Sequence, residues 1–370
     1  MIMNPFLTKT YTGPEYFIDR NRETDKIIEA IENERNLTLF SHRRLGKTML
    51  LGHVFSKLDK KIYQPIFIDL FATRNMTHLI QKTTEVLYDQ KILHQGVINK
   101  ILGGLGASLS FDPVTGSPQV SLSITERDLV MKSLPELFKH LEKSRKKVVI
   151  AFDEFQEVAG YEEENAEASI RTIMQEFPAI TFVFSGSKKS LMQEIFADAN
   201  RPFFQSTQMM ELHEINQDSY AGAVYSILQK HHKDFDPGVV QKILQETYCH
   251  TGFTQMVFSR IYSESEGMID FELYHQVWSG ILEDHKFMAR EQEYLLPKLQ
   301  WKTLIAVAKE EFVRTPQSRE FIQKYHLSTP SSVARAIKAL LDKGIIIDCG
   351  DRGLRVYNVF IQKNLQGFSL

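Results

Sequence analysis

A loop between a short strand and a helix constrains this chain more than any other feature of its sequence. The apolar run Leu37–Phe40 is typical of a buried strand, and a helical pattern resumes over residues 49–58. The loop between them fits the pattern Gly-x4-Gly-Lys-Ser/Thr at Gly46, Lys47 and Thr48, with Ser41 in place of the first glycine. In such a loop backbone N–H groups bind phosphates, the lysine supplies a positive charge and the hydroxyl is a Mg2+ ligand. The sequence therefore predicts a site for a nucleotide phosphate and Mg2+.

Strand and helix patterns alternate through the first 210 residues. Apolar strand-like runs lie at residues 37–40, 65–70, 147–152 and 180–184, with helical patterns at 23–35, 49–58, 77–100, 127–145 and 162–177. Short apolar strands separated by helices are typical of a parallel sheet covered on both faces. We therefore expect an α/β fold, in which residues 1–210 form a P-loop NTPase core. Alternating residues at about 103–124 predict a β-hairpin insertion with its turn at 113–116.

Polar residues follow the third and fourth strand-like runs. Asp153 at a strand tip can hold Mg2+, and Glu154 beside it can take a proton from an attacking water. Two acids in this place can also cap a helix, but a phosphate loop about 100 residues upstream favours the catalytic interpretation. Ser185 or Ser187 could sense the γ-phosphate or orient water, and a helix cap for residues 188–196 is an equally good alternative.

The pattern changes after about residue 210. Residues 211–296 are predicted to form a helical lid domain, and residues 297–370 contain three short helices followed by a hairpin, the order of a winged helix. Residues 298–370 hold twelve lysines and arginines against six acids, a local net charge of +6, whereas the whole chain has −2. This excess predicts phosphate contacts with duplex DNA through Arg335 and Lys338 of the recognition helix and Arg352 of the wing. Docking of a protein partner is the alternative.

Composition places the chain among ordinary globular proteins. Apolar residues make up 43% and charged residues 24%. The sequence has two cysteines, Cys249 and Cys349, which excludes a disulfide scaffold and a cysteine-rich zinc site. We see neither a signal peptide nor a run of about 18 apolar residues that could span a membrane. The expectation is a soluble, cytoplasmic protein without a membrane partner.

Taken together, these motifs resemble the archaeal-type ATPases, a family related to the signal-transducing NTPases with numerous domains (STAND) and more distantly to AAA+ proteins. The resemblance covers nearly the whole chain, including the winged helix. It rests on Phe17-Ile18-Asp19-Arg20 with Glu23, residues 41–48, Asp153-Glu154-Phe155-Gln156, residues 184–187, Arg201-Pro202-Phe203-Phe204 and His250-Thr251.

The resemblance implies roles for further residues. Phe17, Ile18 and Arg20 match the stretch that closes over adenine, and Arg201 matches a position proposed to contact phosphate or a neighbouring module. His250 matches the lid motif, although a structural role as a helix cap is equally open. Two positions depart from the family pattern, namely His42 in place of proline and Cys249 in place of glycine. The predicted catalytic residues are Glu154, Lys47, Ser185 and Arg201, and the predicted nucleotide-binding residues are Phe17, Ile18, Arg20, Arg43, Arg44, Leu45, Gly46, Lys47, Thr48, Met49 and His250.

The sequence supports three functional hypotheses. The first is a molecular switch that binds ATP or ADP with Mg2+, hydrolyses ATP slowly and passes its nucleotide state to the winged helix. The second is a DNA-binding regulator in which the nucleotide is mainly structural. The third is an oligomeric, AAA-like motor.

Overall fold

The computed structural model describes the chain except residues 1–3, 7–10, 103–106, 112–117, 123–126 and 369–370, and it describes no side chains over residues 99–132. The chain forms two compact units, one from Lys9–Ile215 and the other from Met1–Thr8 with Asn216–Leu370.

A parallel sheet organises the unit Lys9–Ile215. Its five strands lie in the order β2 (Tyr63–Asp69), β5 (Lys147–Asp153), β6 (Thr181–Gly186), β1 (Leu37–Phe40) and β7 (Gln208–Glu211). Every pair of neighbouring strands in this sheet is parallel, as the alternating pattern predicts. Strand β7 was not predicted, because its residues Gln-Met-Met-Glu lack the apolar composition of the other strands.

The helices of this unit follow the predicted order with shifted bounds. They are η1 (Pro14–Tyr16), α1 (Asn21–Glu32), α2 (Lys47–Lys57), α3 (Met76–Asp89), α4 (Gln95–Leu102), α5 (Arg127–Glu142), η3 (Phe155–Gly160), α6 (Ala166–Glu176) and α7 (Lys189–Ala197). The single helix expected over residues 77–100 is two helices, α3 and α4. Strands β3 (Ala107–Phe111) and β4 (Pro118–Leu122) pair antiparallel as the expected hairpin, whose turn lies outside the described residues.

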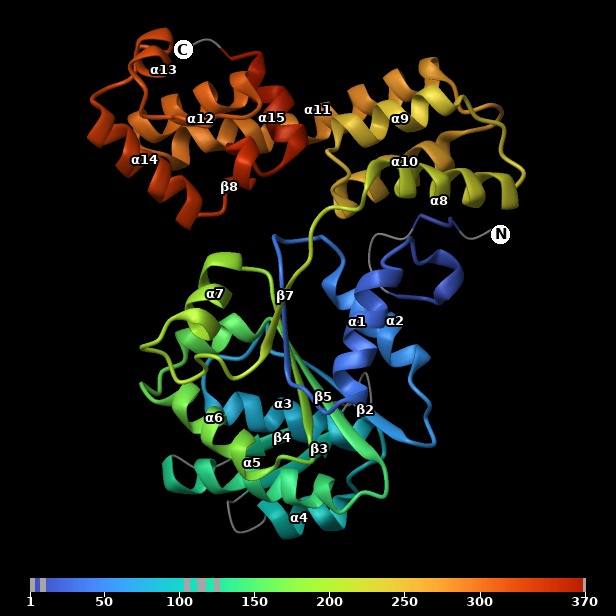
Figure 1. Cartoon of the computed structure of the whole chain (residues 1–370), viewed down its shortest axis with the longest axis vertical. Helices are drawn as coiled ribbons and strands as arrows, with labels where there is room; N and C mark the ends of the chain where they lie inside the picture. The colour runs from blue at the N-terminus through green and yellow to red at the C-terminus, as the bar shows by residue number, and fades with distance from the viewer. Residues whose placement is uncertain (1–3, 7–10, 103–106, 112–117, 123–126, 369–370) are drawn as a thin grey trace. The chain divides into compact units, whose positions relative to one another are not determined.

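Successive residues of the strands pack into different cores on the two faces of the sheet. Ile150 and Phe152 of β5 lie in a cluster with side chains of α3, α5, α6 and α7, whereas Val149 and Ala151 pack with α1 and α2. Figure 1 shows α1 and α2 on one side of the sheet and α6 and α7 on the other. Because side chains alternate along a strand, apolar residues at consecutive positions bury both faces. The mainly apolar runs of the sequence are the consequence of this two-sided burial.

The unit that contains Asn216–Leu370 is mainly helical. Its elements are α8 (Gln217–Lys230), α9 (Pro237–Glu246), α10 (Thr251–Glu264), α11 (Phe271–Leu295), α12 (Lys298–Glu310), α13 (Arg319–Lys324), α14 (Pro330–Asp342), β8 (Ile346–Asp348), η4 (Gly350–Arg352), β9 (Leu354–Val356) and α15 (Val359–Gln366). From α12 to β9 this is the order of three helices and a hairpin that the sequence predicts. Helix α15 packs on both α11 and α12. The division of this unit into lid and winged-helix domains stays a prediction.

A search of the described helices for a long, apolar segment found none that could cross a membrane.

The cluster of phenylalanines on one face of the sheet offers a test of the core. Phe184 is fully buried, and its ring lies 4.5 Å from that of Phe155 and 5.3 Å from that of Phe196, between centroids. We expect Phe184→Ala to lower the free energy of unfolding by about 3–5 kcal/mol, since it leaves a cavity in a packed core. The control Phe71→Ala, at a side chain that is 70% exposed, should change it by less than about 0.5 kcal/mol. Urea denaturation of both variants checks this, and equal effects would contradict the packing described.

Candidate functional site

The carboxyl ends of three adjacent strands bring the predicted motifs together. Phe40 of β1 is in register with Gly186 of β6, and Phe152 of β5 is in register with Phe184 of β6. The Ser41 backbone N–H donates to the Gly186 carbonyl oxygen at 3.3 Å. The phosphate loop, the acids after β5 and the serines after β6 therefore share one edge of the sheet, where parallel α/β folds bind ligands.

The loop adopts a backbone conformation suited to an anion. Arg44 and Gly46 have φ of +57° and +94°, and α2 begins at the next residue with no side-chain cap. Because the first N–H groups of a helix lack intrahelical partners, such an end binds anions. The Ser41 hydroxyl is buried and donates to the His42 carbonyl oxygen at 2.7 Å, so serine is accommodated where the pattern has glycine.

Lys47 is a buried cation held by uncharged oxygens. Its Nζ donates to Ser41 Oγ at 2.9 Å and to the His42 carbonyl oxygen at 3.5 Å, and the residue is 5% exposed. Burial lowers the pKa of Lys47 to about 8, and the negative charges of Glu154 and Asp153 offset only part of that effect. An anion that enters the loop would stabilise the charged form of this lysine.

Thr48 and Asp153 form the pair expected at a magnesium site. Thr48 Oγ1 donates to Asp153 Oδ2 at 2.6 Å. Burial raises the pKa of Asp153, while the hydroxyls of Ser185 and Thr48 favour its charged form. A hydroxyl and a carboxylate are oxygen ligands that Mg2+ accepts, usually together with phosphate oxygens and water. Over the part of the chain with described side chains, no group of three acidic, histidine or cysteine residues could hold a metal. The Thr48–Asp153 pair of oxygen ligands fits a Mg2+ ion that arrives with a nucleotide.

Glu154 is fixed by contacts that the sequence did not reveal. Its φ is +54°, and its Oε2 accepts hydrogen bonds from Ser187 Oγ at 2.7 Å and from Gln156 Nε2. The sequence singles out Gln156 only as part of the Asp-Glu-Phe-Gln stretch. Its partner Ser187, which follows another strand, could not be predicted from spacing alone.

Residues 17–214 match the model of the ATPase domain predominantly from Archaea, which is more than half of the chain. The chain belongs to this ATPase family. Residues 290–367 match the model of a probable winged helix domain. The protein is thus an ATPase with a P-loop, nucleotide-binding core and a C-terminal winged helix. No curated protein matches the sequence.

Solved structures have the same fold over nearly the whole chain. The Walker-type ATPase PABY2304 of Pyrococcus abyssi is 17% identical, with a TM-score of 0.69 over 98% of this chain and 99% of that one. The ORC2 protein of Aeropyrum pernix, in its ADPNP-ADP complexes, is 11% identical, with a TM-score of 0.61 over 98% of this chain and 97% of that one. At these identities the likeness concerns the fold alone.

The predicted adenine segment lies beside the phosphate loop. Arg20 is buried, donates to Glu23 Oε1 at 3.0 Å and donates to the Leu45 carbonyl oxygen at 3.3 Å. Phe17 stacks on His53 of α2 with 4.1 Å between the ring centroids. Ile18 between them is buried. These contacts join the segment to the phosphate loop at Leu45 and to α2 at His53, and its contact with adenine stays a prediction.

Arg201 and His250 both have structural partners. Arg201 donates to Glu167 at 3.0 Å and to Glu194, so it links α6 and α7. His250 is the N-cap of α10, where its Nδ1 accepts from the Phe253 backbone N–H at 3.4 Å. This is the structural alternative that the sequence left open for His250. A nucleotide contact of either residue remains a prediction.

The basic excess of the C-terminal segment is only partly available to DNA. Arg335, Lys338 and Arg352 are exposed, although Arg352 also lies over the Phe312 ring at 5.1 Å. Arg355, which contributed to the charge of +6, is fully buried and donates to two backbone carbonyl oxygens. Lys363 is also engaged, in ion pairs with two glutamates. The charge count therefore overstated the basic surface.

Lys47→Ala tests the phosphate loop. We expect the affinity for ATP to fall roughly 100-fold, because the phosphates lose a charged hydrogen-bond donor. Lys57→Ala, at the exposed C-terminal end of the same helix, is the matched control and should bind normally. Calorimetric titration with ATP measures both, and near-wild-type affinity of Lys47→Ala at physiological salt would rule out this loop as the nucleotide site.

Proposed function

We propose that this ATPase is a slowly hydrolysing, Mg2+-dependent switch that passes its nucleotide state to the winged helix. One observation carries the proposal: Lys47, the Thr48–Asp153 pair and the restrained Glu154 lie at the ends of adjacent strands. The proposed kinship with STAND NTPases fits such a role and depends on the sequence resemblance alone.

Each group at this edge has a distinct task in the proposal. The backbone N–H groups at the start of α2 and the Lys47 ammonium bind the phosphates. Thr48 and Asp153 would hold Mg2+, which supplies charge neutralisation on the β- and γ-phosphate oxygens. Glu154 accepts a proton from the attacking water as general base.

The pairing of Arg201 supports slow turnover. An arginine that reaches the transferred phosphoryl group is worth roughly 10³- to 10⁵-fold in kcat. Arg201, which the family resemblance relates to phosphate, instead donates to Glu167 and Glu194. While Arg201 keeps these two partners it supplies no charge to a phosphoryl group, and hydrolysis is then expected to be slow.

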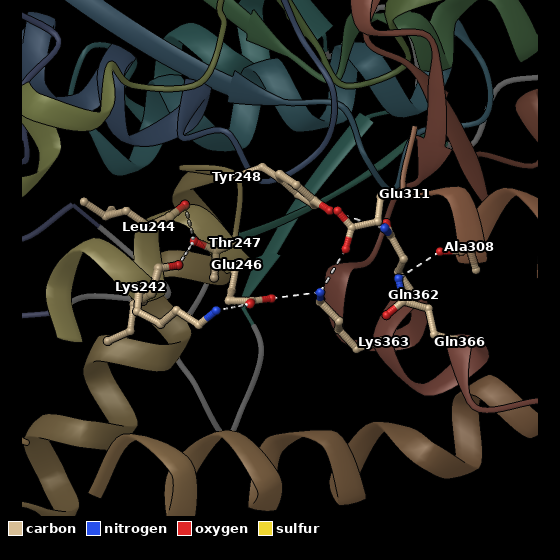
Figure 2. A network of polar contacts seen from close by, with 11 residues as sticks. Lys242, Leu244, Glu246, Thr247, Tyr248, Ala308, Glu311, Gln362, Lys363 and Gln366 are labelled. Carbon is tan, nitrogen blue, oxygen red and sulfur yellow. Dashed lines mark hydrogen bonds and ion pairs between the residues drawn. The ribbon is translucent and has the colours of Figure 1, made fainter. Parts of the chain in front are cut away.

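A polar network supports coupling between the helical segment and the winged helix. Glu246 at the end of α9 pairs with Lys242 at 2.7 Å and with Lys363 of α15 at 2.9 Å, and Lys363 also pairs with Glu311 at 3.1 Å (Figure 2). The burial-driven rise in the pKa of Glu246 is outweighed by its two lysine partners, so its pKa is lowered. The charged network ties α9 to α15, so a displacement of one helix acts on the other.

Residues of the winged helix also hold the turn after α9 in place. Gln362 of α15 donates to the Tyr248 hydroxyl at 3.3 Å, and the Arg355 guanidinium lies 4.8 Å from the Tyr248 ring centroid (Figure 2 includes Tyr248 and Gln362). Tyr248 and Cys249 have φ of +52° and +54°, a conformation that persists only where neighbours enforce it. This turn leads directly into His250 at the start of α10. The winged helix thus contacts the segment that carries the predicted lid motif.

Two substitutions separate the tasks of the acids. Glu154→Gln should retain ATP binding and lower kcat about 10²- to 10⁴-fold, because an amide cannot take the proton. Asp153→Asn should instead weaken the Mg2+-dependent part of ATP affinity. ATP binding with and without Mg2+, together with phosphate release, checks both. If the two variants behave alike, or if Glu154→Gln hydrolyses normally, the assigned roles are wrong.

Glu154→Gln also allows a test of the switch, since it should keep ATP bound. We expect hydrogen exchange over α15 and residues 246–250 to differ between ATP-bound Glu154→Gln and ADP-bound wild-type protein. Identical exchange in the two states would exclude transmission to the winged helix. A stable ring that forms with ATP, measured by light scattering, would favour the oligomeric motor instead.

Weak duplex DNA binding is the second candidate function. Exposed Arg335 and Lys338 on α14 of the winged helix domain favour it. We expect binding without strong sequence preference that weakens steeply with salt, as phosphate contacts do. Replacing Arg335, Lys338 and Arg352 by alanine should remove it and leave ATPase activity intact.

The matched control replaces three exposed basic residues of the ATPase unit, Arg22, Lys60 and Lys61, with the same change in charge. Titration of labelled duplex at low and physiological salt compares the two triple variants. No binding by the wild type at low salt discards the DNA candidate, and equal loss in both variants would indicate only a general charge effect.

A further inference from the structure

We propose that Gln156 is a positioning residue for the general base, which it holds together with Ser187. This inference rests on the proposed function, in which Glu154 takes the proton from water. It assigns the amide of Gln156 to orientation of the Glu154 carboxylate and the Ser187 hydroxyl to the same task, in place of γ-phosphate sensing.

The contacts converge on one oxygen of the base. Glu154 Oε2 accepts from Ser187 Oγ at 2.7 Å and from Gln156 Nε2. A carboxylate oxygen has two lone pairs, so these donors occupy Oε2 and leave Oε1 to accept a proton. Two donors on one oxygen fix both the position and the plane of the carboxylate.

Gln156 is itself locked in place. The residue is 2% exposed, and its Oε1 accepts from the Ser187 backbone N–H at 3.1 Å. A Cβ added to Gly186 would lie 2.5 Å from this Oε1 and would also collide with Met192. The side-chain amide is therefore held against the end of β6, where its Nε2 donates to Glu154 Oε2 and, at 3.4 Å, to Glu157 Oε1.

The backbone conformation of Glu154 explains why its side chain needs these restraining hydrogen bonds. Its φ of +54° and ψ of +39° put a non-glycine residue in the left-handed region. This conformation costs free energy and persists when the surroundings over-determine it. The hydrogen bonds to Oε2 supply that constraint. A base held in this way needs little reorganisation to meet a bound water, and loose support of a catalytic group typically lowers activity.

Loss of either donor should reduce the rate of chemistry and spare nucleotide binding. We expect Gln156→Met and Ser187→Ala each to lower kcat about 10- to 100-fold, the effect typical of residues that orient a reactive group. The affinity for ATP and the melting temperature should stay close to wild type. Ser187→Thr keeps the hydroxyl and should recover most of the rate, which a loss of packing would not predict.

A double variant separates positioning from a merely structural role. In the Glu154→Gln background, adding Gln156→Met should leave the residual rate unchanged, because no base remains to be positioned. Single-turnover hydrolysis of the intact chain measures all five variants. A further decrease in the double variant, or a kcat of Gln156→Met equal to or above wild type, overturns the inference.

The same experiment keeps this inference apart from the proposed function. If Glu154→Gln hydrolyses ATP as fast as wild type, the general base has been misassigned and the proposed function fails. If Glu154→Gln is inactive while Gln156→Met and Ser187→Ala are fully active, only the positioning role fails.

Discussion

The buried ammonium group of Lys47 is the constraint on which the rest of the site depends. A cation removed from water is unfavourable unless it is paired. Among the described residues, the Lys47 ammonium donates to the uncharged Ser41 Oγ and His42 carbonyl oxygen, and the negative charges of Glu154 and Asp153 offset only part of the cost of burial. This unfavourable burial lowers the pKa of Lys47 to about 8. The loop conformation and the uncapped start of α2 favour a bound anion, which would stabilise the charged form of Lys47. A bound phosphate would supply the negative partner that this buried lysine needs.

The order of the strands in the sheet determines which side chains lie near Lys47. Because β6 lies between β1 and β5, the polar ends of three strands converge even though residues 41, 153 and 187 are far apart in sequence. Asp153 and Glu154 are neighbours in the chain, yet their surroundings differ. Asp153 is buried beside Thr48, whereas Glu154 turns into the left-handed region and is held by Gln156 and Ser187. Two adjacent carboxylates can thereby serve a metal and a water molecule separately.

Much of this arrangement could be predicted from the sequence, because apolar strands that end in polar residues carry both the fold and the site. Residues 37–40, 148–152 and 180–184 are buried on both faces of the sheet and therefore stand out as mainly apolar runs. Strand β7 could not be found in this way, since it lies at the edge of the sheet and its side chains are only partly buried. The partners of Gln156 depend on strand register and backbone conformation, which composition does not encode. The burial of Arg355 depends on tertiary packing, and a charge count treats every arginine as exposed.

A direct measurement of the Lys47 pKa tests the central claim. Protein with 13Cε-labelled lysine can be titrated by NMR with and without ATP, and the signal absent from Lys47→Arg identifies Lys47. The account predicts a pKa near 8 in the nucleotide-free protein and a marked increase when ATP binds, because the phosphates stabilise the charged form. A pKa at the ordinary lysine value of 10.5 that does not change with ATP would contradict it.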